Sequence, residues 1–123
     1  MGRYYSGDIE GKFWFAVQSS DAADRFGVYG TAPNTLEYFY DMDDLPDVEK
    51  ELQKIKKIIG KDNLKKIDEF FTTNNGYNDK MLEDAGILDI WITHKKDYAD
   101  YTLGLKIKNC LKRHGSCGFT AEL

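Results

Sequence analysis

The chain has 123 residues, of which 41% are hydrophobic, 14% aromatic and 31% charged, and its formal net charge at pH 7 is −4. This length suits one hydrophobic core, so we predict a single domain over residues 1–123, ordered because its apolar content can offset chain entropy. No apolar run approaches the roughly 20 residues that a membrane span needs, so we expect no membrane partner.

The predicted elements begin with a hairpin. Gly7 and Gly11 bracket a short acidic segment and tolerate positive φ, which predicts a turn between strands at residues 3–5 and 12–18. In the second strand, alternation puts Phe13, Phe15 and Val17 on one face and Trp14 on the other.

A short helix is expected next, with Ser19 or Ser20 as its N-cap and Gly27 as its left-handed terminator. Residues 35–41 are rich in aromatic side chains and alternate Leu36, Tyr38 and Tyr40 with Glu37 and Phe39, which predicts a strand.

The most regular helical pattern follows that strand. Asp43 or Asp44 is expected to cap a helix in which apolar residues from Leu45 to Ile59 recur every three or four positions, and Gly60 ends it. A second helix is predicted around residues 64–71. Asn78 is expected to cap a third, which Gly86 ends.

The last third is predicted as a strand, a helix and a strand. Residues 87–93 are rich in β-branched and aromatic side chains, which favours a strand. A helix is expected at residues 97–114, ended by Gly115, with a terminal strand at residues 118–123. The predicted fold class is therefore α+β: a small, mainly antiparallel sheet with an N-terminal hairpin, packed against three to five helices.

Charge and cysteine content narrow the expected partners and location. A negative protein repels phosphates over most of its surface, so duplex nucleic acid is not an expected partner. Cys110 and Cys117 are too few for a secreted disulfide scaffold, so we predict reduced thiols and a cytoplasmic protein. His114 is the only nitrogen ligand near these two cysteines in the sequence, so a tetrahedral zinc site would lack its fourth ligand. We therefore predict no metal and no cofactor.

Two sets of residues suggest different functions. The first set is Asp8, Glu10 and Lys12. It resembles the residues of metal-dependent nucleases that use an acid followed by Glu-x-Lys, in which the carboxylates hold a divalent ion and the lysine orients the attacking water. The alternative set is aromatic and polar, and such residues contribute strongly to interfaces. It comprises Arg3, Tyr4, Tyr5, Asp8, Trp14, Gln18 and Arg25, of which Arg3, Tyr5, Trp14 and Arg25 are the predicted binding residues.

Residues 2–26, from Gly2-Arg3-Tyr4-Tyr5 to Asp24-Arg25-Phe26, resemble the opening of uncharacterised small proteins encoded by viruses, including phages. The resemblance implies an accessory role, in the cytoplasm of the host cell, and identifies no catalytic residue.

These observations together favour a non-enzymatic viral accessory protein that binds a protein partner or a small anionic ligand through its aromatic hairpin, with a homodimer as one arrangement. A metal-dependent nuclease or phosphodiesterase is the alternative hypothesis.

Overall fold

The computed structural model of the chain describes residues 3–14, 17–30, 35–74 and 76–122. Phe15 of the predicted second strand and Leu123 of the predicted terminal strand lie outside this part. The elements, in chain order, are β1 (Tyr4–Gly7), β2 (Gly11–Lys12), the 3-10 helix η1 (Ala22–Phe26), β3 (Thr35–Asp41), the 3-10 helix η2 (Met42–Asp44), α1 (Leu45–Ile59), α2 (Lys61–Thr73), α3 (Asp79–Asp84), α4 (Leu88–His114) and β4 (Ser116–Glu122).

The four strands form one antiparallel sheet in the order β2-β1-β4-β3. The C-terminal strand β4 lies between the N-terminal hairpin and β3, where Tyr5 pairs with Ala121 and Tyr38 pairs with Phe119. Buried and half-buried residues alternate along β4 because its side chains point to opposite faces of the sheet. The α+β fold with an N-terminal hairpin is thereby confirmed.

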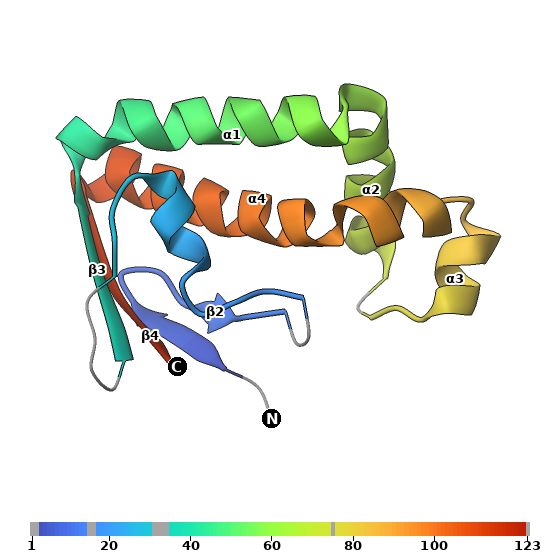
Figure 1. Cartoon of the computed structure of the whole chain (residues 1–123), viewed down its shortest axis with the longest axis horizontal. Coiled ribbons are helices and arrows are strands. Elements are labelled where there is room, and N and C mark those ends of the chain that lie inside the picture. Colours follow the sequence, from blue (N-terminus) through green and yellow to red (C-terminus); the bar gives the residue numbers. More distant parts are fainter. Residues whose placement is uncertain (1–2, 15–16, 31–34, 75, 123) are drawn as a thin grey trace.

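Helix α4 lies next to the sheet, whereas α2 and α3 lie at the opposite end of the molecule (Figure 1). Helices α1 and α4 run side by side in opposite directions, and α2 crosses the far end of the pair. Apolar residues of α1, α4 and the sheet share one hydrophobic core, in which the largest fully buried side chains include Tyr40, Phe26, Ile55, Ile59, Ile107 and Leu111. The core therefore joins residues from both ends of the chain.

Helix α1 follows the predicted pattern closely. Val48, Leu52, Ile55 and Ile59 are buried, whereas Ile58 is 45% exposed. Their three- and four-residue spacing places them on one face of the helix. Asp44 occupies the N-cap position of α1, as predicted, but makes no side-chain capping bond to that helix. Its side chain instead forms a capping box with Asp41 in the preceding η2.

The predicted strand at residues 87–93 is wrong, because these residues form the first turns of α4, which starts at Leu88 rather than at residue 97. Ile87 and Trp91 are both buried and lie four residues apart, whereas Ile92 is 58% exposed. That spacing suits a helix, and the β-branched residues cost a helix only a few tenths of a kcal/mol each. Packing on one helical face thus outweighs strand propensity.

The second hairpin strand is shorter than predicted. Pairing ends at Lys12, although the N–H of Phe13 still donates to the carbonyl of Arg3 at 2.8 Å. The N–H groups of Val17 and Gln18 both donate to the carbonyl of Trp14, at 3.1 and 2.9 Å, so the chain turns there. This local turn competes successfully with continued strand pairing.

The helix predicted from Ser19 or Ser20 is also corrected. Asp21 occupies the N-cap position of η1 without a side-chain capping bond, and Ser20 instead accepts a hydrogen bond from Arg3. Gly27 ends η1 with φ of 102°, as predicted.

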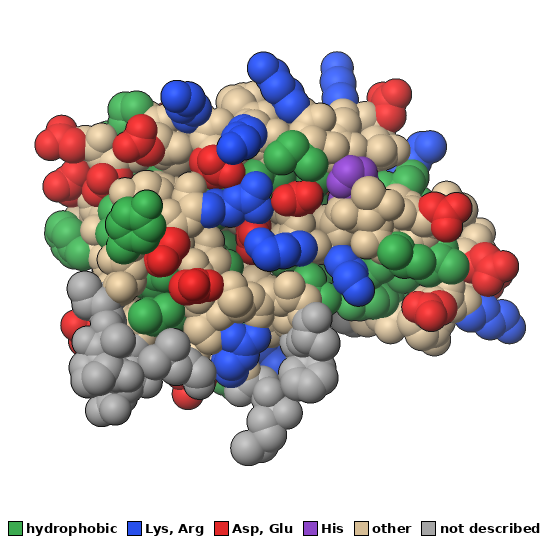
Figure 2. Space-filling view, in the orientation of Figure 1, with side chains coloured by type: hydrophobic (Ala, Val, Ile, Leu, Met, Phe, Trp, Pro, Cys, Tyr) green, Lys and Arg blue, Asp and Glu red, His purple; other side chains and the backbone are tan. Residues whose placement is uncertain are grey.

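Charges of both signs are spread over the molecular surface (Figure 2). On the face shown, acidic side chains gather where β3 meets α1, and lysines and arginines are scattered over the helices. Within the described residues, no helix is both long and apolar enough to cross a membrane.

Candidate functional site

The hairpin contributes one wall of an open groove, which we call the Trp14 groove. Its other wall is the end of α2 and the connection to α3, and its volume is about 750 Å³. The described residues that line it are Lys12, Phe13, Trp14, Phe71, Asn74, Gly76 and Tyr77. The groove therefore combines an aromatic lining with one lysine.

The second wall lies between two asparagine side chains that fix the end of α2 and the start of α3. Asn74 donates from its side chain to the carbonyl of Phe70 at 2.8 Å, at the end of α2. The side chain of Asn78 accepts from the N–H of Met81 at 2.9 Å and caps α3. Between these ends the chain carries Tyr77, which is 41% exposed, along the groove.

An aromatic cluster supports the half-buried Trp14. Its ring centroid lies 5.3 Å from that of Trp91, 5.5 Å from that of Phe71 and 6.2 Å from that of Tyr77. Tyr98 also packs against it. Such contacts add to the energy of apolar burial and restrict ring movement. The groove is consequently built on a packed base.

The predicted residues Arg3 and Tyr5 serve packing instead of lining the groove. Arg3 donates to the hydroxyl of Ser20 and to the carbonyl of Gln18, and its guanidinium carbon lies 5.5 Å from the centroid of the Phe13 ring. Tyr5 is only 5% exposed, and its hydroxyl accepts from Lys106 at 2.9 Å. Both residues fix the hairpin against the rest of the fold.

Arg25 belongs to a buried polar network centred on Asp100, a residue that the sequence analysis did not single out. The fully buried carboxylate of Asp100 accepts from Arg25 at 2.7 Å, from Lys96 at 3.0 Å and from Gln18 at 3.0 Å. Arg25 also donates to Glu51 at 2.9 Å. The network joins η1 to α1 and α4 and satisfies the buried charge.

Burial and these contacts shift the pKa of several groups. Burial alone would lower the pKa of Arg25, but its hydrogen bonds to Asp100 and Glu51 raise it overall. Burial raises the pKa of Tyr98, and a hydrogen bond to Asp68 adds to the effect. Both groups therefore keep their protons throughout the physiological range.

Asp8, Glu10 and Lys12, the residues of the nuclease hypothesis, do not line one common pocket in the described structure. The carboxylate of Asp8 accepts from the N–H of Gly118 at 2.8 Å, and Asp8 and Glu10 line a pocket of about 280 Å³ beside α4. Lys12 lines the Trp14 groove, with its ammonium 5.9 Å from the centroid of the Tyr4 ring. Among the described residues, no group of three or more His, Cys, Asp or Glu side chains could hold a metal ion.

Both cysteine thiols are free and buried. The thiol of Cys110 donates to the carbonyl of Ser116 at 3.4 Å. Burial raises the pKa of Cys117, and the nearby Cys110 adds to the shift. A buried thiol that retains its proton is a poor nucleophile, so Cys117 acts here as a small apolar side chain.

Comparison of the chain with protein-family models, curated proteins and solved structures gave no match. The assignment of a site therefore depends on the geometry above.

Proposed function

We propose that this chain is a non-enzymatic binding protein that holds a protein partner in the Trp14 groove. The observation that carries the proposal is the half-buried Trp14, which forms an open groove with the exposed ring of Tyr77 above a packed aromatic base. Exposed aromatic side chains on a rigid base lose little entropy on binding and supply much of the energy of protein interfaces.

The lining favours a peptide segment over a small anion. Lys12 is the one charged side chain among the described residues that line the groove, so a free anion would find little compensation there. A segment with a large apolar side chain next to an acidic one would match both the rings and Lys12. The resemblance of residues 2–26 to virus-encoded proteins suggests the setting, an accessory role in the cytoplasm of an infected cell.

A selection from a random-peptide display library on the immobilised chain tests this proposal. We expect enriched peptides to pair a large apolar residue with an acidic one, and to bind Tyr77→Ala at least about tenfold more weakly than the original chain. Lys12→Gln should weaken binding several-fold. Tyr29→Ala is the control, because Tyr29 is 79% exposed and does not line the groove.

Equal affinities for the original chain and all three variants would overturn the proposal. Self-association through the same groove is the competing arrangement, and sedimentation equilibrium distinguishes it. A dimer that dissociates in Tyr77→Ala would replace the separate protein partner with a second copy of the chain.

A further inference from the structure

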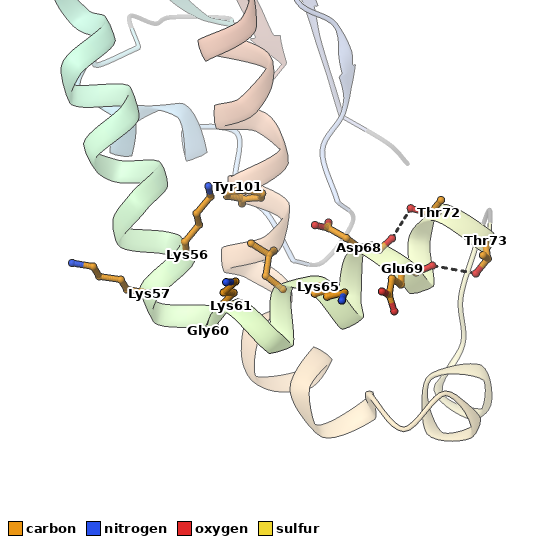
Figure 3. Close-up of a pocket in the computed structure, with 11 residues that line it drawn as sticks. Lys56, Lys57, Gly60, Lys61, Lys65, Asp68, Glu69, Thr72, Thr73 and Tyr101 are labelled. Atoms are coloured by element: carbon orange, nitrogen blue, oxygen red, sulfur yellow. Dashed lines mark hydrogen bonds between the residues drawn. The ribbon is translucent and has the colours of Figure 1, made fainter.

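A second groove, which we call the lysine groove, lies at the corner where α1 ends and α2 begins, with Tyr101 of α4 beside it (Figure 3). Its volume is about 870 Å³. Four lysines contribute to its lining, together with two acids and an apolar floor. The lining residues are Lys56, Lys57, Gly60, Lys61, Leu64, Lys65, Asp68, Glu69, Thr72, Thr73 and Tyr101.

The lysines of this groove are not neutralised by the protein. Within the described residues, no carboxylate oxygen lies within 4.0 Å of any of the four ammonium groups. Of the two acids, Asp68 already accepts a hydrogen bond from Tyr98 at 2.8 Å. In a chain whose net charge is −4, this cluster forms a local region of positive potential that would attract an anion.

Helix dipoles explain only half of the cluster. Lys56 and Lys57 lie in the last turn of α1, where positive charge is favourable. Lys61 and Lys65 lie in the first two turns of α2, where positive charge opposes the dipole. They are also four residues apart on one face, so they repel each other. A bound anion would remove both unfavourable effects.

The start of α2 supplies further donors. Leu64 is the first residue of this helix whose N–H reaches a helical acceptor, the carbonyl of Gly60 at 2.9 Å. The N–H groups of the preceding three residues therefore have no partner within the helix. Such groups at the start of a helix bind phosphate oxygens well.

Tyr101 is the independent sign of a ligand. Its side chain lines the groove although the residue is only 8% exposed, and among the described residues its hydroxyl makes no hydrogen bond. Burial, followed by the nearby Asp68, raises its pKa, so the phenol stays protonated and can donate. Figure 3 shows Lys56 extending toward Tyr101, which brings an ammonium group and this donor to the same side of the groove.

We propose that the lysine groove binds a small anion that carries two or more phosphate groups. Phosphate oxygens accept hydrogen bonds from ammonium, phenol and backbone N–H donors, and residues carrying all three kinds of donor line this groove or begin α2 beside it. The four lysines and two acids of the lining carry a net charge of +2, so a monoanion would leave part of that charge uncompensated and an anion with two or more charges matches it better. This site is separate from the Trp14 groove and does not depend on its function.

Isothermal titration of the full chain with sodium tripolyphosphate tests the proposal. We expect saturable one-to-one binding, weakened about tenfold or more in the double variant Lys61→Gln/Lys65→Gln. Tyr101→Phe removes only the hydroxyl and should weaken binding about three- to tenfold without changing the charge.

The matched control is Lys80→Gln/Lys112→Gln, which removes the same charge from positions outside the groove and should change the affinity less than about twofold. Tyr77→Ala should also leave the affinity unchanged, which separates this site from the Trp14 groove. An absence of saturable binding would overturn the proposal. It would also be overturned if the two double lysine variants weakened binding equally and Tyr101→Phe bound as tightly as the original chain.

Discussion

Gly104 of α4 offers a sharp test of how the helices pack, because two known effects of replacing it by alanine have opposite signs. A Cβ atom at this position would lie 2.4 Å from Cε1 and 2.5 Å from Cζ of Phe26, and 2.8 Å from Cδ2 of Leu52. Carbon atoms in ordinary contact are about 3.5–4.0 Å apart. Phe26 and Leu52 are 0% and 2% exposed, so neither can move aside into solvent.

The sizes of these two effects decide whether Gly104→Ala raises or lowers the free energy of unfolding. Alanine gains about 1 kcal/mol over glycine inside a helix, whereas forcing an extra methyl group into a packed core costs about 1–3 kcal/mol and occasionally more. Because the overlap here exceeds 1 Å with a buried ring, we take the upper part of that range. Gly104→Ala should therefore lower the free energy of unfolding by about 1–2 kcal/mol.

Urea unfolding followed by far-UV circular dichroism measures this change, with the slope m checked for constancy. Asn109→Ala is a control on the exposed side of the same helix, where only the propensity gain applies. Adding Phe26→Leu to Gly104→Ala should recover part of the loss, and the double-mutant cycle should show a coupling of about 1 kcal/mol. A Gly104→Ala variant that is more stable than the original chain would refute the packing of η1 against α4.

Three further predictions concern charges and caps. Arg25→Ala leaves the buried carboxylate of Asp100 without its closest cation, so urea unfolding should show a stability loss of about 2–3 kcal/mol. This is somewhat below the loss of about 3–5 kcal/mol on breaking a fully buried ion pair. A loss under about 0.5 kcal/mol would contradict this role. Burial raises the pKa of Tyr38, so the folded phenol keeps a proton that the unfolded chain releases above a pH of about 10. The contribution of Tyr38 to the free energy of unfolding is therefore complete below that pH and falls by about 1.4 kcal/mol per pH unit above it. Tyr38→Phe should make the alkaline slope shallower by that amount, and an unchanged slope would count against the burial. Asn78→Ala removes the acceptor of the Met81 N–H and should cost α3 about 1 kcal/mol by amide hydrogen exchange, whereas Asn78→Asp should leave protection nearly intact.

The sequence predicted best the elements whose signals are local. Helix α1 was predictable because its apolar spacing and its terminator, Gly60, lie within one continuous segment. The strand propensity of residues 87–93 gave a wrong prediction because packing against the rest of the core determines which face of α4 is buried. That packing cannot be read from residues 87–93 alone. The four-residue spacing of the apolar residues Ile87 and Trp91, which places both on one face of a helix, was the available signal for the helix.

The candidate sites were less predictable than the fold. Trp14, one of the predicted binding residues, lines a groove, but its neighbour Tyr77 is distant in sequence and is brought beside it only when the connection after α2 packs near α4. Asp100 looked like an ordinary helical surface acid because nothing local indicates that Arg25 reaches it. The lysine groove depends in the same way on the bend at Gly60, where φ is 91°.

The emission of Trp14 tests the central claim most directly. The measurement uses the Trp91→Phe variant, so that Trp14 is the one indole left, and adds a saturating amount of the highest-affinity selected peptide. We predict a shift of the emission maximum to shorter wavelength and protection from acrylamide quenching, because the partner covers the exposed part of the indole ring. Emission and quenching that stay the same at saturation would contradict the assignment of the Trp14 groove as the binding surface.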